Sequence, residues 1–186
     1  MRQDALAADL ERRNARLMER AESIPARFSP EALRRRPAPG KWSPAEILEH
    51  LVRSDEGYLA PMRSLVAEAR ADGRGPGWRD RRWRPTLMGR LLVWALGSKR
   101  PTPTVAALEP QAGGARGEAS LARFLELRRE MAGLIGKSAD LPWRRLRFTS
   151  PYSALVRPNL GDAFLVTVVH AERHLDQIDR QAPGDS

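Results

Sequence analysis

Cysteine is absent from this chain of 186 residues, and its absence excludes several kinds of chemistry. A chain without thiols has no disulfide framework, no thiolate metal site and no cysteine nucleophile. Any sulfur chemistry would therefore require a thiol supplied by another molecule.

Long apolar runs are also absent. The longest, LLVWAL at residues 91–96, is far shorter than the roughly 20 residues that a membrane-spanning helix needs. Residues 1–17 carry charges throughout and lack the apolar stretch of a secretory signal. We therefore expect a cytoplasmic protein without a transmembrane segment.

Lysine is scarce, so arginine carries nearly all of the net charge of +9. Nine basic and two acidic residues lie between residues 70 and 100, which gives this segment +7 and leaves only +2 for the rest of the chain. Nucleic-acid-binding domains typically carry their basic charge over a whole face. A single basic segment does not predict nucleic acid as a partner.

Helical periodicity is the dominant pattern that is present. Apolar residues recur at spacings of three and four in four segments, at residues 4–23, 43–69, 118–137 and 159–181. The second segment begins with Ser43-Pro44-Ala45-Glu46, which is a capping box with proline at the first helical position. These segments predict an all-α protein with four long helices.

The segment at residues 72–117 interrupts this pattern. It holds eight of the fourteen glycines and five of the fifteen prolines, which predicts a basic, irregular insert with one short helix at residues 85–96. We therefore predict a single domain over residues 1–186. It is a four-helix bundle with a long insert between the second and third helices and a flexible tail at residues 182–186.

Only three histidines occur, and all three fall on apolar helix stripes. His170 and His174 lie one turn apart on the predicted fourth helix, and His50 lies on the second. Three imidazoles facing one another predict a transition-metal site with an open coordination position, as in catalytic sites. The alternative is that the histidines are purely structural, so that replacing His170 would lower stability without changing metal content.

Two strings around these histidines resemble a known family. GKWSPAEILEHL contains His50, VVHAERHLDQI contains His170 and His174, and both are similar to the signature helices of the DinB/YfiT-like superfamily. The resemblance covers most of the chain. It implies an up-up-down-down four-helix bundle, often a homodimer, with a divalent metal held by those three histidines.

The resemblance also implies a metal-dependent enzyme acting on a small-molecule substrate. The two reaction types are transfer of a low-molecular-weight thiol to an electrophile and hydrolysis. Zinc and nickel are the first candidates for the metal because both suit imidazole ligands, and manganese and iron are the alternatives. We carry no family function onto the basic insert.

A non-catalytic protein is the competing hypothesis, in which the bundle holds a ligand and the arginine-rich insert binds an anionic partner. Trp78 and Trp83 alternate with arginines in this insert, a pattern that suits nucleic-acid bases, phosphates or an anionic membrane surface. We favour a loop whose tryptophans pack as a lid over the bundle. In that case the arginines would lie near the site and favour an anionic substrate.

Other polar and aromatic residues have two interpretations each. Glu46 lies one turn before His50 and is a candidate base, although the capping box explains it without catalysis. Asn14 and Tyr58 fall near inward stripes, either beside the site or as part of the core. We expect Asp176 and Asp179 to face solvent or a neighbouring helix.

Overall fold

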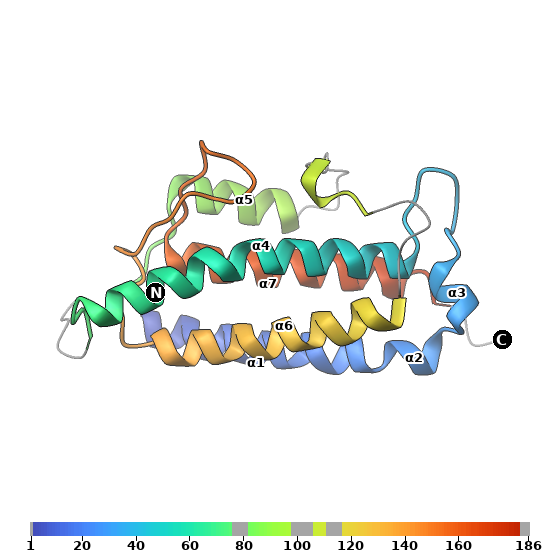
Figure 1. The fold of residues 1–186 in the computed structure, drawn as a ribbon, viewed down its shortest axis with the longest axis horizontal. Helices are drawn as coiled ribbons and strands as arrows, with labels where there is room; N and C mark the ends of the chain where they lie inside the picture. Colours follow the sequence, from blue (N-terminus) through green and yellow to red (C-terminus); the bar gives the residue numbers. More distant parts are fainter. Residues whose placement is uncertain (1, 76–81, 98–105, 111–116, 183–186) are drawn as a thin grey trace.

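The structure is a computed structural model that describes residues 2–75, 82–97, 106–110 and 117–182. Within these ranges the chain is all-α, with only isolated bridges outside the helices, as the sequence predicts. The four long helices are α1 (Gln3–Glu22), α4 (Pro44–Ala71), α6 (Gly117–Ser138) and α7 (Leu160–Asp179) (Figure 1). The shorter ones are α2 (Ile24–Arg27), α3 (Pro30–Arg34), α5 (Leu87–Gly97) and the 3₁₀ helix η1 (Ala106–Leu108).

The helices that carry the histidines both begin at side-chain caps, and the sequence predicts the first of them. At the start of α4, the Ser43 hydroxyl accepts from the Glu46 amide at 3.3 Å, and the Glu46 carboxylate accepts from the Ser43 amide at 2.8 Å. At the start of α7, the Asn159 side chain accepts from the Asp162 amide at 2.9 Å. These caps satisfy orphan backbone donors and fix the residue at which each helix begins.

The long helices run in the order up, down, down, up (Figure 1). Residue numbers rise together in the pairs that join α1 to α7 and α4 to α6, and they run oppositely between α4 and α7. These pairs are Arg13–Glu172 and Arg20–Asp176, Glu56–Arg123 and Arg63–Glu130, and Trp42–Gln181 and Ser54–His170. The up-up-down-down order implied by the resemblance is therefore wrong.

The connections explain this order. An up-up-down-down bundle needs two long crossovers, one before its second helix and one before its fourth. Here residues 23–43 and 139–159 both return the chain at the end where the preceding helix stops, so each joins antiparallel helices. Only the insert between α4 and α6 crosses the length of the bundle, and it makes these two helices parallel.

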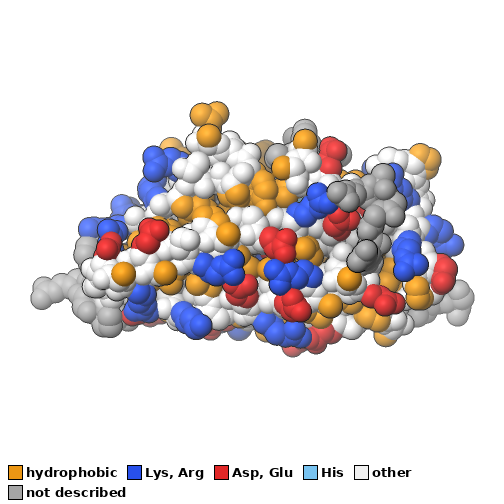
Figure 2. Space-filling view, viewed as in Figure 1, with side chains coloured by type: hydrophobic (Ala, Val, Ile, Leu, Met, Phe, Trp, Pro, Cys, Tyr) orange, Lys and Arg blue, Asp and Glu red, His pale blue; other side chains and the backbone are white. Residues whose placement is uncertain are grey.

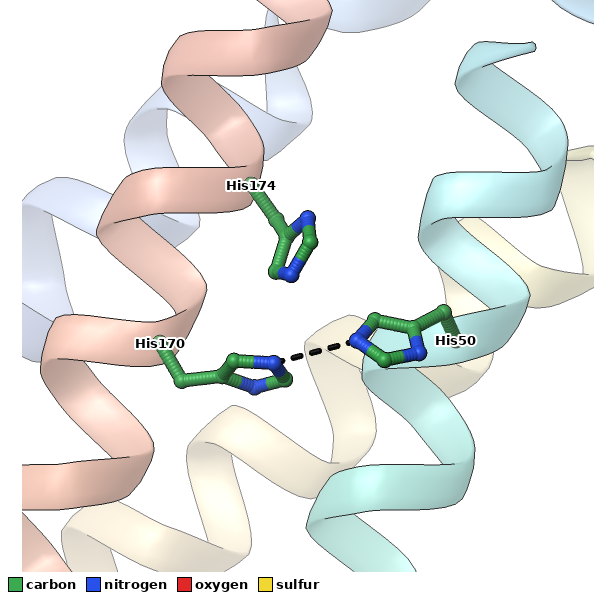
Figure 3. A group of neighbouring side chains, drawn as sticks. All are labelled: His50, His170 and His174. Atoms are coloured by element: carbon green, nitrogen blue, oxygen red, sulfur yellow. Dashed lines mark hydrogen bonds between the residues drawn. The ribbon is translucent and has the colours of Figure 1, made fainter. Parts of the chain in front are cut away.

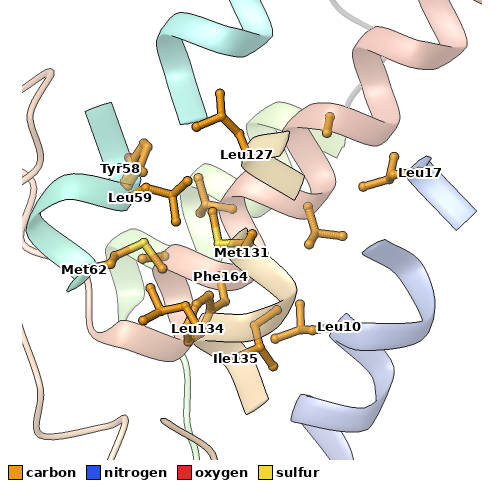
Figure 4. Close-up of a cluster of buried hydrophobic side chains, with 14 of the residues drawn as sticks. Leu10, Leu17, Tyr58, Leu59, Met62, Leu127, Met131, Leu134, Ile135 and Phe164 are labelled. Carbon is orange, nitrogen blue, oxygen red and sulfur yellow. The ribbon is translucent and has the colours of Figure 1, made fainter. Parts of the chain in front are cut away.

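The apolar core fills the bundle between the four long helices (Figure 4). Leu10, Leu59, Met131 and Phe164 come from α1, α4, α6 and α7 in turn, and none of these side chains is exposed. Complete burial of a side chain of this size contributes about 1.5–3 kcal/mol. The histidines lie beyond this cluster, toward the end where α4 begins and α7 ends.

The predicted short helix of the insert is present as α5, which packs on the outside of α7. Trp83 is buried at the start of α7, where its indole N–H donates to the Asn159 side chain at 3.0 Å. A Cβ at Gly161 would lie only 2.3 Å from the Trp83 ring nitrogen, so this contact requires glycine. No helix in the described ranges has the length and apolar character needed to cross a bilayer.

Trp83 therefore packs on the bundle, as the lid interpretation predicts, but it lies far from the histidines. His170 lies nine residues beyond Gly161 along α7, which is roughly 14 Å of helix. Arg82 forms a backbone bridge with Arg2 at that same distant end. Arg82 therefore does not lie beside the histidines, while Trp78 falls outside the described residues. Residues 183–186 of the predicted tail also fall outside the described residues.

Candidate metal centre

The structure brings the three histidines together inside the bundle (Figure 3). His50 comes from the second turn of α4, and His170 and His174 come from successive turns of α7. One ring nitrogen from each lies within 4.8 Å of the others, and the ring centroids are 4.6–5.0 Å apart. His50 and His170 are buried, and His174 is partly buried. Two antiparallel helices thus present three imidazoles to one point.

Each imidazole also has a hydrogen-bond partner on its outer nitrogen. The Nδ1 of His50 lies 2.8 Å from the Leu108 carbonyl, and that of His174 lies 3.1 Å from the Gln177 side-chain oxygen. The Nδ1 of His170 lies 3.4 Å from the Ser54 hydroxyl. Such partners orient imidazoles and fix which nitrogen is free, as they do around protein-bound metals.

These partners determine the tautomers. The Leu108 carbonyl can only accept, so Nδ1 of His50 carries the proton and its Nε2 has a free lone pair. Nε2 of His170 lies 3.0 Å from that lone pair and donates to it when no ion lies between them. A serine hydroxyl both donates and accepts, so Ser54 can serve either tautomer of His170. The inner nitrogens can therefore all become acceptors without any change of partner.

Burial keeps the three imidazoles neutral. It lowers the pKa of His174 to about 3, with the neighbouring His50 adding to the effect. Burial also lowers the pKa of His50, although the Leu108 carbonyl opposes this. The pKa of His170 is held well below its usual range by burial, with contributions from His174 and His50. Neutral imidazole is the form that binds a metal.

The cluster has further neighbours that the sequence did not single out. The Trp42 ring lies 5.0 Å from the His50 ring and stacks at 25° on His174, with 6.5 Å between centroids. Leu108 belongs to η1, so the insert itself supplies one of the hydrogen-bond partners. Gln177 follows His174 by three residues, a helical spacing that indicates contact and could have identified it. A backbone carbonyl such as that of Leu108 has no sequence signal.

Glu46 is engaged in the capping box. Its carboxylate accepts from the Ser43 amide and pairs with the Arg36 guanidinium, and Arg36 lowers the pKa of Glu46. It is not among the residues whose ligand atoms gather at the histidines. These contacts favour the structural interpretation of Glu46 over the catalytic one.

The remaining residues singled out from the sequence lie in the structural framework. Tyr58 packs its ring against Phe148 and Tyr152. Asp176 and Asp179 face α1 and pair with Arg20. The Asn14 amide, which is buried, donates to a backbone carbonyl of α6 at 2.9 Å. None of these residues belongs to the histidine cluster in the part of the chain that the structure describes.

Comparison with known proteins gives one match. The family model of the DinB superfamily matches residues 9–178, a range that includes all three histidines. No curated protein and no solved structure matches the chain.

Proposed function

The chain belongs to the DinB superfamily, and on that basis we propose that it is a divalent-metal-dependent enzyme whose ligands are His50, His170 and His174. One observation carries the proposal. Three neutral imidazoles direct inner nitrogens to one point while their outer nitrogens have separate partners in Leu108, Ser54 and Gln177. The inner nitrogens of His50 and His170 lie 3.0 Å apart, and the outer partners let both of them turn to an ion instead.

The donor set suits a transition metal. Imidazole nitrogens bind zinc and nickel well, and manganese or iron would also be accepted, whereas magnesium and calcium prefer oxygen ligands. With three protein ligands, a bound ion keeps a coordination position open and can lower the pKa of a thiol or water that occupies it. We therefore propose that the reaction is transfer of a low-molecular-weight thiol to an electrophile, or hydrolysis.

The protein's own residues would then orient and shield the site. Leu108, Ser54 and Gln177 hold the imidazole planes, and Trp42 covers His50 and His174 on one side. The chain has no cysteine, so in thiol transfer the thiol must enter as a cosubstrate. Exclusion of water by buried walls strengthens electrostatic interactions inside the site.

Metal content tests the proposal. We expect mass spectrometry of untagged protein to find about one transition-metal ion per chain in the wild type and almost none in His170→Ala. Thr167→Ala is the matched control, because Thr167 is a buried residue on the same helix whose hydroxyl bonds only its own helix, at the Phe164 carbonyl. It should keep its metal.

Circular dichroism shows whether each variant is folded. A folded wild type that takes up no zinc, nickel, manganese or iron would overturn the metal site. If metal binds but neither thiol transfer nor hydrolysis is detected across substrate screens, and His170→Ala lowers only metal content, the non-catalytic alternative is favoured.

A further inference from the structure

Helix α5 presents an apolar face to solvent. Of the five large hydrophobic side chains that are exposed in the described ranges, four belong to this one helix. They are Leu87, Met88, Leu91 and Trp94, and Leu87 and Trp94 are 83% and 64% exposed. Figure 2 shows the side of the molecule on which α5 lies, where both apolar and basic side chains reach the surface. A patch of this kind usually marks an interaction site.

The apolar face is held in a defined orientation. At the start of α5, the Thr86 amide and hydroxyl both donate to the Asp162 carboxylate, at 3.1 Å and 2.7 Å. At its end, the Arg173 guanidinium donates to the carbonyls of Ala95 and Leu96, at 3.2 Å and 3.1 Å. Both ends of the helix are therefore bonded to α7, and its outer side chains cannot turn inward.

Close packing of the inner face reinforces this orientation. Gly89 is buried against α7, where a Cβ would lie 2.4 Å from the Asp162 carboxyl carbon. Leu92, Val93 and Leu96 pack against the core from the same side. At 100° per residue, Leu87, Leu91 and Trp94 fall within about 60° of one another on the opposite side. The helix is apolar on both faces, which distinguishes it from an ordinary surface helix.

Arginines border this face in the described residues, and basic residues dominate the sequence around it. Arg90 is exposed and lies about 40° from Trp94 around the helix, at the border of the apolar face, and Arg84 is exposed just before α5. Eight basic residues and one acidic residue, Asp80, lie between residues 73 and 108. An apolar helix face with tryptophan and bordering arginines is typical of helices that lie on membrane surfaces.

We propose that the outer face of α5 docks on the surface of an anionic lipid bilayer. Leu87, Leu91 and Trp94 would enter the boundary between headgroups and acyl chains, while Arg84 and Arg90 would contact lipid phosphates. A second copy of the chain fits less well, because two such faces would bring their arginines together. Nucleic acid fits less well because these leucines offer no hydrogen bonds to bases. The inference is independent of the metal and goes beyond the proposed enzyme.

Vesicle binding tests the inference. The full chain is mixed with vesicles of phosphatidylcholine alone, or of phosphatidylcholine with phosphatidylglycerol, and the bound fraction is measured by flotation. We expect binding to the anionic vesicles only, weakening as salt is raised. The Leu91→Gln/Trp94→Gln variant should bind about tenfold or more weakly. Arg90→Gln should bind about fivefold more weakly.

Arg16→Gln is the matched control, since Arg16 is an exposed arginine on α1 and its loss removes the same charge. It should bind vesicles as the wild type does. Three outcomes would overturn the inference: no binding of the wild type to anionic vesicles, equal binding to neutral vesicles, or a Leu91→Gln/Trp94→Gln variant that binds normally. Light scattering tests a fourth outcome. If the Leu91→Gln/Trp94→Gln variant had half the solution mass of the wild type, the face would be assigned to a second copy of the chain. Metal content, measured in parallel, should not change.

Discussion

Two polar clusters lie inside the bundle on neighbouring turns of α4, and they are stabilised in opposite ways. The first is the histidine cluster between α4 and α7, whose members are neutral and hydrogen-bonded outward. The second is the ion pair of Asp55 and Arg128 between α4 and α6, in which both side chains are fully buried. Ser54 and Asp55 are consecutive residues, so one turn of α4 contributes to both clusters.

The difference distinguishes a cluster that can bind a ligand, the histidines, from one that joins two helices, the ion pair. The two charges of the ion pair are directed at each other, and Arg128 also contacts the Phe124 ring, with 5.5 Å from its guanidinium carbon to the ring centroid. The pair therefore neutralises its own charges inside the bundle without a ligand. The histidines present inner nitrogens that can all become acceptors for an additional partner. Buried polarity alone does not identify a functional site; the direction of the free lone pairs does.

The largest expected effect on stability comes from breaking the ion pair of Asp55 and Arg128. Arg128→Met would leave Asp55 buried without a counter-charge, and we expect a loss of about 3–5 kcal/mol in the free energy of unfolding. Urea denaturation measures it. Replacing both members, as Asp55→Leu/Arg128→Met, should recover most of the loss, because well-packed apolar residues can replace a buried pair.

An exposed ion pair between the same helices provides the control. Arg63 and Glu130 also join α4 to α6, at 2.6 Å, but both are exposed or nearly so. Arg63→Met should therefore lower stability by less than about 1 kcal/mol. If Arg128→Met proved no worse than Arg63→Met, the comparison between the two clusters would fail.

Much of the framework around the two clusters was readable from the sequence because its signals are local. Apolar spacing and the Ser43–Glu46 capping box predicted the long helices, and the spacing of His170 and His174 placed both on one face. The ion pair was not predicted, because charged residues in mid-helix usually face solvent and nothing local relates Asp55 to Arg128. The expected order of helix directions was wrong for a similar reason. It depends on the path of the insert across the bundle, which no local signal determines.

The two clusters should also respond oppositely to acid. Unfolded histidines take up protons below about pH 6.5, whereas the buried imidazoles take them up at lower pH because burial lowers their pKa values. The unfolded state then binds more protons, so the histidines make stability fall as pH falls from about 6.5 toward about 3, the pKa of His174. Burial raises the pKa of Asp55 to about 6, so Asp55 takes up its proton first in the folded state and opposes this loss.

Urea denaturation between pH 7 and pH 5, in the presence of a chelator, measures this response. Each imidazole contributes up to about 1.4 kcal/mol per pH unit once the pH is well below 6.5. His174→Leu should therefore show a shallower loss of stability than the wild type by about that amount. The contribution of Asp55 is common to both proteins and cancels in the difference. Identical slopes would show that His174 is protonated in the fold.

The last expected effect is on metal affinity and concerns Ser54, which precedes Asp55 on α4. Ser54→Ala removes the partner of the His170 outer nitrogen without touching an inner one. Loss of such a partner typically weakens metal binding 10–100-fold, and the long 3.4 Å contact places our expectation near tenfold, or about 1.4 kcal/mol. Competition with a chelator of known affinity measures it.

Ser64→Ala is the matched control, because Ser64 is an exposed serine on the same helix whose hydroxyl donates to the Ala60 carbonyl. It should leave metal affinity unchanged. A metal affinity unchanged in Ser54→Ala would mean that the outer partners do not prepare the imidazoles for a metal. Ser54 is the group that lets His170 exchange tautomers when an ion replaces its contact with His50. Without that role, the two clusters would differ only in the charge of their members. A tenfold loss of metal affinity confined to Ser54→Ala would instead give the adjacent side chains of α4 different roles. Ser54 would support metal binding, and Asp55 would stabilise the bundle through Arg128.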